Sequence, residues 1–178
     1  MRYTTSGESH GRVLTAIVTG VPAGIHIDQS MIDADLARRQ VGYGRGGRMR
    51  IETDTASILS GVRFSRTIGS PIAMAVSNRD WDNWTDVMAT HGEPLDDARL
   101  TAPRPGHADL PGVLKTCSND VRDILERASA RETAARVASG AIAKAFLRHV
   151  GVVVSSFVFA IGGASENRHA SRSMHRRC

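Results

Sequence analysis

The chain has 178 residues, of which 41% are apolar, 23% charged and 4% aromatic. This length and composition suit one globular domain and exclude a disordered chain. No apolar run reaches the roughly 18 residues that a membrane span needs, and the N-terminus lacks the apolar core of a signal peptide. Two cysteines provide neither a disulfide framework nor a metal quartet. These exclusions predict a reduced, cytoplasmic protein.

Basic residues outnumber acidic ones, with 23 Lys and Arg against 18 Asp and Glu and a net charge of +5. All the basic residues except Lys115 and Lys144 are Arg. Arg forms planar, bidentate contacts with carboxylates and phosphates, so this usage fits anionic ligands, although codon bias explains it equally well. Much of the excess lies in residues 166–178, and nucleic-acid binding therefore does not follow from the charge alone.

The first predicted element is a strand over residues 12–19, whose nearly continuous apolar run indicates burial on both faces. A turn containing Gly and Pro follows at residues 20–24. Ser30 and Asp33 then form a capping-box-like pair, which predicts a helix from Ser30 to about Arg39.

Three more segments favour extended or irregular structure. Residues 56–62 and 71–77 predict two strands, and the alternating apolar residues of the second indicate that it is half exposed. From 78 to 104 this periodicity ends, and polar residues, tryptophans and prolines indicate a long functional loop. Residues 152–161 have strong β propensity and predict a further strand.

The clearest helix is predicted to begin at Ser129, which forms a capping box with Glu132, and to end at Gly151. A stripe of mostly small apolar residues recurs along it at helical spacing, at Ala134, Val137, Ala138, Ala141, Ile142, Ala145 and Phe146. The small side chains of this stripe predict close packing against another helix.

Two histidines lie in glycine-flanked turns, His10 in Gly7-Glu8-Ser9-His10-Gly11 and His107 in Arg104-Pro105-Gly106-His107-Ala108-Asp109. A histidine in such a turn can approach a ligand closely and exchange a proton near neutral pH. For the His10 segment, an ordinary surface turn is the favoured interpretation when that segment is taken alone. Asp109 either orients the His107 ring or caps the next helix, and taken alone the segment favours capping.

Two arginine clusters are candidate anion sites. Residues 38–50 hold five arginines among glycines, with no acidic residue before Glu52, and an anion would relieve their repulsion. A solvated charge run or an RNA contact explains this stretch equally well. Arg127 and Arg131 flank the predicted helix start at Ser129, where free N–H groups and the helix dipole favour phosphate over the alternative of an ordinary cap.

Taken together, four segments resemble the chorismate synthase family. They are the Gly-Glu-Ser-His-Gly start, the Arg-Arg-Gln-x-Gly-x-Gly-Arg-x-x-Arg-Met stretch, Arg-Pro-Gly-His-Ala-Asp, and Arg-Ala-Ser-Ala-Arg-Glu-Thr-Ala. The resemblance predicts that residues 1–163 are the N-terminal part of the family fold. Residues 164–178 leave the pattern and read as a basic tail, from a shifted reading frame, an artificial terminus or a natural variant.

The resemblance implies a lyase of the shikimate pathway, in the biosynthesis of aromatic amino acids. The family converts 5-enolpyruvylshikimate 3-phosphate to chorismate and phosphate by a trans-1,4 elimination. Reduced FMN is required, although the reaction has no net redox change. His10 and His107 match the two catalytic histidines: one protonates the leaving phosphate, and the other keeps the reduced flavin in its working protonation state.

The remaining implied site residues bind anions. Arg39 and Arg45 match positions that contact the substrate and are also assigned to NADPH, the candidate reductant. Arg127, Ala128 and Ser129 match an FMN-binding segment. Arg131 is a candidate contact for the substrate phosphate. No metal is implied.

The implied architecture is α+β, with helices sandwiched between antiparallel β-sheets, and the implied assembly is a homotetramer with neither nucleic acid nor membrane as partner. Family members are much longer, and their C-terminal half carries more flavin contacts, a substrate-binding Arg and a catalytic Asp. We therefore expect the Ala-rich stripe to be exposed, and this chain alone to have little or no activity. The alternative function is a Gly/Arg-rich nucleic-acid-binding module.

Overall fold

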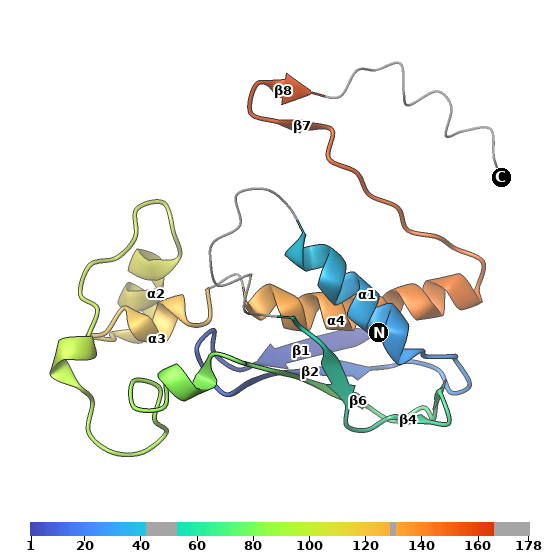
Figure 1. The fold of residues 1–178 in the computed structure, drawn as a ribbon, viewed down its shortest axis with the longest axis horizontal. Helices are drawn as coiled ribbons and strands as arrows, with labels where there is room; N and C mark the ends of the chain where they lie inside the picture. The colour runs from blue at the N-terminus through green and yellow to red at the C-terminus, as the bar shows by residue number, and fades with distance from the viewer. Residues whose placement is uncertain (42–52, 129–130, 166–178) are drawn as a thin grey trace.

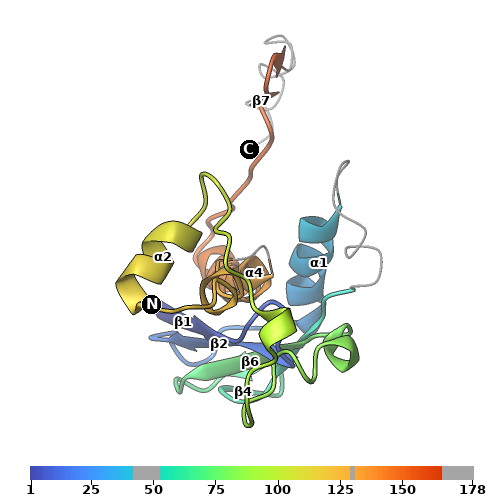
Figure 2. The same cartoon turned by 90° about the vertical axis from the view of Figure 1, so that its left-hand side faces the viewer.

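The computed structural model describes residues 1–41, 53–128 and 131–165. Their centre is a four-stranded antiparallel sheet in the order β1-β2-β6-β3, made of β1 Arg2–Ser6, β2 Val13–Thr19, β6 Ile72–Ser77 and β3 Ala56–Ile58. Two long helices, α1 Gln29–Gln40 and α4 Glu132–His149, lie side by side on one face of this sheet (Figures 1 and 2). The α+β expectation with antiparallel sheets is confirmed.

Strand β2 shows why only one sheet face is buried. Leu14, Ala16 and Val18 are almost completely buried and face the helices, whereas Ile17 is 45% exposed. The prediction that this strand is buried on both faces is therefore wrong. In the described part of the chain the helices cover one face of the sheet, and successive side chains of a strand point to opposite faces.

Helix α1 begins at Gln29, one residue before the start predicted from the sequence. Asp28 is the N-cap, because its side chain accepts the backbone N–H of Ser30 at 2.9 Å. The predicted pairing of Ser30 with Asp33 is wrong. Asp33 instead accepts the backbone N–H of Ala56 at 3.1 Å and so ties the helix to the edge strand β3.

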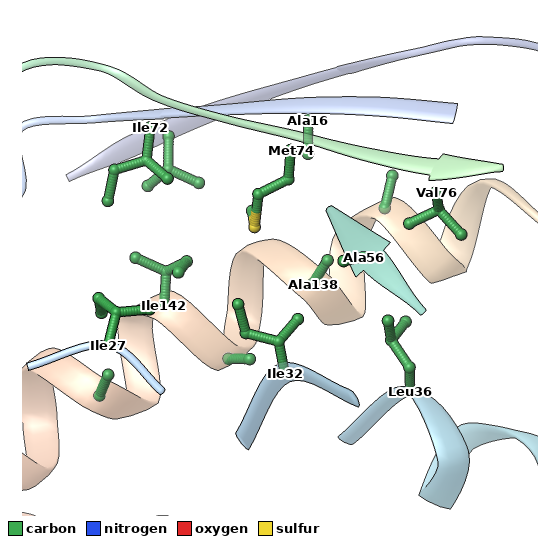
Figure 3. Packing of buried hydrophobic residues seen from close by; sticks show 14 of the residues in the cluster. Ala16, Ile27, Ile32, Leu36, Ala56, Ile72, Met74, Val76, Ala138 and Ile142 are labelled. Atoms are coloured by element: carbon green, nitrogen blue, oxygen red, sulfur yellow. The ribbon is translucent and has the colours of Figure 1, made fainter. Parts of the chain in front are cut away.

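The Ala-rich stripe of α4 forms the middle of the core. Ala134, Ala138 and Ile142 are fully buried, and Figure 3 shows Ala138 and Ile142 between the sheet residues and the α1 residues Ile32 and Leu36. The predicted packing against another helix is confirmed, and the expected exposure of the stripe is wrong. Small side chains let α4 approach both the sheet and α1, so both surfaces cover the stripe. The predicted start at Ser129 lies outside the described residues.

The predicted strand over residues 56–62 is interrupted. Its second part belongs to a separate hairpin of β4 Val62–Arg63 and β5 Arg66–Thr67. Gly61 makes the break, because its φ is +83° and a Cβ there would lie 2.5 Å from the carbonyl oxygen of Pro71. The strand predicted at 71–77 is confirmed as β6, half buried as expected.

The predicted long loop over 78–104 is confirmed, with two short 3₁₀ turns, η2 Trp81–Asn83 and η3 Asp96–Ala98. It leads into two short helices, α2 Asp109–Thr116 and α3 Arg122–Leu125. Both lie beyond one end of the main sheet (Figure 1). Among the described helices none has the length and apolar character needed to cross a membrane.

The strand predicted at 152–161 is largely wrong. Residues 152–159 form no strand, and only the short hairpin of β7 Ala160–Ile161 and β8 Ala164–Ser165 follows. The segment extends away from the body (Figure 1), with Val153 80% and Phe157 70% exposed. β propensity reflects packing on a paired, half-buried surface, and here the run has no neighbouring strand among the described residues.

Candidate active site

His10 lies in the turn between β1 and β2, and Glu126 holds it at two points. Its ring Nδ1 is 2.7 Å from Glu126 Oε1, and its backbone N–H donates to Glu126 Oε2 at 2.8 Å. Glu126 caps the C-terminal end of α3 and its side chain is only 2% exposed. The backbone of Ser9 donates to the main-chain oxygen of Glu126 at 3.0 Å. The turn is therefore bound to α3 by side chain and backbone together.

Two residues of the long loop complete the setting of His10. The indole of Trp84 lies against its ring, with centroids 3.7 Å apart and planes inclined by 33°. Asn78 donates from Nδ2 to the carbonyl oxygen of Gly11 at 2.8 Å, and its own backbone N–H donates to Arg12 at 3.1 Å. The loop thus contacts the His10 turn at its ring and at its main chain, and the His10 side chain stays 19% exposed.

Arg127, the residue after Glu126, also contacts the turn that carries His10. Arg127 donates to the carbonyl oxygen of Gly7 and, at 3.3 Å, to that of Thr5. Gly7 is required there, because its φ is +98° and a Cβ would lie 2.3 Å from the Val13 carbonyl oxygen. The predicted FMN-binding segment therefore begins against the His10 turn. Ala128 is half buried, and Ser129 lies outside the described residues.

His107 is oriented by a carboxylate close to it in the sequence. Its Nδ1 lies 3.0 Å from Asp109 Oδ1, and Arg104 Nε donates to Asp109 Oδ2 at 2.7 Å. These bonds, first of all those from Arg104, hold the pKa of Asp109 well below its ordinary value. The expected capping role is wrong: Ala108 is the N-cap of α2 without a side-chain cap, and Asp109 orients His107 and Arg104.

A third carboxylate, that of Asp54, contacts two of the predicted anion-binding arginines. Asp54 is 1% exposed; Arg39 Nη2 donates to its Oδ2, and Arg131 Nη1 to its Oδ1 at 2.8 Å. Arg131 also donates to the main chain of Ser77 at the end of β6, at 2.7 Å. The structure therefore brings Arg39 and Arg131 together from α1 and the start of α4. Arg45 lies outside the described residues.

A cavity of about 550 Å³ opens beside Glu8 of the turn that carries His10. Its walls come mainly from the long loop and the α2–α3 connection, together with Glu8 and Arg122. Arg122 is also 3.5 Å from Glu126 and has its guanidinium 5.6 Å from the Trp84 ring centroid. Of the site residues that the sequence predicts and the structure describes, none lines this cavity. Within the described ranges no group of three His, Cys, Asp or Glu side chains is arranged to hold a metal ion.

Sequence reasoning located the two histidines and missed what holds His10. Glu126, Trp84 and Asn78 were not singled out, and neither was Asp54. For Glu126 one signal was present, since it directly precedes the predicted FMN-binding segment. No pattern in the sequence marked the other three as partners, because each lies at least 15 positions from the histidine, turn or arginine that it contacts.

Comparison with known proteins places these features in one family. The chorismate synthase family model matches residues 1–178. The chorismate synthase of Chlorobium phaeobacteroides is 59% identical over 167 residues, covering 93% of this chain and 42% of that protein. That of Geobacter metallireducens is 58% identical over 174 residues, covering 97% and 44%. A crystal structure of chorismate synthase matches with a TM-score of 0.68 and 44% identity, covering 93% of this chain and 39% of that one.

Two consequences follow from these comparisons. The chain spans less than half the length of the curated relatives it matches. The alternative of a Gly/Arg-rich nucleic-acid-binding module finds no support, and Arg39 from that stretch is an interior residue with a side chain only 10% exposed.

Proposed function

The chain belongs to the chorismate synthase family, and we propose that it carries the N-terminal part of an enzyme that makes chorismate. The reaction is the trans-1,4 elimination of phosphate from 5-enolpyruvylshikimate 3-phosphate, with reduced FMN. We further propose the family's cytoplasmic homotetramer, and NADPH as the reductant of the flavin. The polypeptide of residues 1–178 on its own then has little or no turnover.

The observation that carries this proposal is the pair of histidines held by carboxylates. His10 and His107 each meet a carboxylate oxygen through Nδ1, at 2.7 and 3.0 Å. A carboxylate partner orients an imidazole, and a proton-transfer group requires such a defined orientation. In our proposal one histidine protonates the leaving phosphate and the other maintains the protonation state of the flavin.

The substrate is anionic, and the Asp54 cluster is suited to it. Arg39 and Arg131 both pair with Asp54, and the three side chains are at most 10% exposed, so the surroundings are largely closed to water. Charge pairing in such surroundings is stronger than in bulk water. We propose that Arg39 and Arg131 bind the substrate phosphate or carboxylates together with Arg45, and that Arg39 and Arg45 also serve NADPH.

Arg127 fits the phosphate of FMN. Its guanidinium has five N–H donors, more than the carbonyl oxygens of Thr5 and Gly7 use, and the residue is exposed. We propose that Arg127, Ala128 and Ser129 hold this phosphate beside the His10 turn. When bound, reduced FMN supplies an electron transiently, which explains why the elimination needs a reduced flavin.

The test is an anaerobic assay with chemically reduced FMN and authentic substrate, following chorismate by absorbance. The protein is a chimera that joins residues 1–163 to the remainder of the Chlorobium phaeobacteroides enzyme, with that enzyme as positive control. We expect turnover by the chimera and little or none by residues 1–178 alone. A folded chimera without turnover contradicts the proposed activity. Turnover by the shorter polypeptide at the level of the positive control contradicts the need for the rest of the fold.

A further inference from the structure

We propose that Glu126 is a positioning residue that holds His10 in the Nδ1–H tautomer, so that Nε2 is the nitrogen at which His10 takes up and releases its proton. This inference rests on the proposed function in one respect, namely that His10 is one of the two proton-transfer groups. The assignment of the tautomer itself follows from the contacts around the ring.

The contact between Glu126 and the ring defines which nitrogen carries the hydrogen. A carboxylate only accepts hydrogen bonds, so at 2.7 Å the Nδ1 of His10 must donate to Glu126 Oε1. In neutral imidazole one nitrogen is a donor and the other an acceptor. With Nδ1–H committed to Glu126, the neutral ring presents the Nε2 lone pair, and the protonated ring presents Nε2–H.

The Glu126 carboxylate cannot change its orientation without breaking other bonds. Its second oxygen accepts the backbone N–H of His10 at 2.8 Å, so both carboxylate oxygens are directed at the same residue. Arg122 lies 3.5 Å from Oε1 and balances the charge of a carboxylate that is only 2% exposed. A buried carboxylate with charged and backbone partners keeps a single orientation, because losing any partner leaves a buried charge unsatisfied.

The ring is equally restricted. Trp84 covers one of its faces at a centroid distance of 3.7 Å, and the indole is itself anchored, because Nε1 donates to Asp80 Oδ2 at 2.9 Å. A ring flipped about the Cβ–Cγ bond would place the carbon Cδ2 at the position of Nδ1, and the 2.7 Å bond to Glu126 would be lost. Ring, indole and carboxylate thus define one rotamer and one tautomer.

The proton transfer involves only Nε2 of His10. Where His10 is the histidine that protonates the leaving phosphate, its protonated ring gives the Nε2 hydrogen to a phosphate oxygen, and the bond electrons remain on Nε2 as a lone pair. The Nδ1–H bond is not broken, so the ring returns to the neutral Nδ1–H form and keeps its bond to Glu126. The carboxylate therefore holds the ring in one orientation before and after the transfer.

The test is ¹⁵N NMR of the imidazoles in the labelled 178-residue chain, at a pH of about 9, where histidines are neutral. The seven histidines are resolved by comparison with a His10→Gln spectrum, which lacks the His10 signals. We expect a protonated Nδ1 and an unprotonated Nε2 in His10. An unconstrained neutral histidine favours the opposite tautomer, so the expected signature is specific.

Glu126→Met removes the acceptor at similar length, and we expect the His10 ring to change to mainly Nε2–H. Glu132→Met is the matched control: Glu132 is also buried and hydrogen-bonded, to Thr5 at 2.8 Å, but does not contact His10. It should leave the Nδ1–H signature unchanged. Mainly Nε2–H in the unaltered chain overturns the proposal, and so does Nδ1–H retained in Glu126→Met. If Glu126→Met does not fold, the spectrum of the unaltered chain decides.

This measurement needs neither substrate nor flavin, so it is independent of the activity assay. An inactive chimera together with the Nδ1–H signature would refute the proposed function and leave the tautomer assignment intact. An active chimera together with an Nε2–H ring would support the proposed function and refute the tautomer assignment.

Discussion

His10 and His107 are each held by a carboxylate through Nδ1, but the two pairs are built differently. His107 and Asp109 are separated by two positions and belong to one turn leading into α2. His10 and Glu126 are separated by 116 positions and meet only when the turn after β1 packs against α3. The local pair needs only a short loop, whereas the distant pair requires most of the fold. A substitution in the distant pair should therefore destabilise a larger part of the molecule than one in the local pair.

The largest expected effect is on catalysis, where both pairs should matter alike. In the active chimera, we expect His10→Ala and His107→Ala each to lower kcat by about 10²–10⁴-fold, the usual contribution of a general acid or base. The melting temperature should hardly change for His107→Ala. It should fall slightly more for His10→Ala, because that ring is 19% rather than 35% exposed. Steady-state kinetics and thermal unfolding check both points, and full activity in either variant would remove that histidine from the mechanism.

The difference between the pairs should appear in stability. We expect Glu126→Gln to destabilise the 178-residue chain by about 2–3 kcal/mol, because it weakens buried hydrogen bonds to a charged group. Hydrogen exchange should then increase both around His10 and in α3. Asp109→Asn should increase exchange only around residues 101–116, since that pair opens locally. Urea unfolding and residue-resolved exchange measure the two responses. If hydrogen exchange increased over equally wide parts of the chain in both variants, the distinction between a local and a distant pair would be contradicted.

The smallest expected effect is a pH dependence confined to the local pair. Arg104 lowers the pKa of Asp109 in the folded state, so the pair stabilises the fold at pH values above the ordinary Asp pKa of about 3.9. That contribution declines as the pH falls below this value towards the lower pKa of the folded state. The difference in melting temperature between the unaltered chain and Asp109→Asn should be constant above about pH 5 and shrink below about pH 4.

Asp28 also has a lowered pKa, mainly through the backbone N–H of Ser30, but it is present in both proteins and its contribution cancels. A difference that persists unchanged well below pH 4, or that grows there, would show that the charge of Asp109 does not carry the effect.

The part of the candidate site around His107 could be predicted because its residues are close together in the sequence. Asp109 lies two positions from His107, and its two candidate roles could be stated from the sequence, although the favoured one was wrong. Choosing between them needed the position of Arg104, whose guanidinium competes for the same carboxylate. Glu126, Trp84 and Asp54 could not be found this way, because their partners lie on other elements and a single sequence contains no record of contacts between distant residues.

The family, the positions of His10 and His107 and the helical stripe of α4 can be read from the amino-acid sequence, since motifs and 3.6-residue periodicity are properties of neighbouring residues. What covers each face depends on the tertiary structure of the folded chain. It buried the α4 stripe between the sheet and α1, left Ile17 exposed, and left residues 152–159 without a strand partner. It also placed Glu126 on His10. Burial and pairing depend on which surfaces meet in space, and propensity along the chain does not specify that.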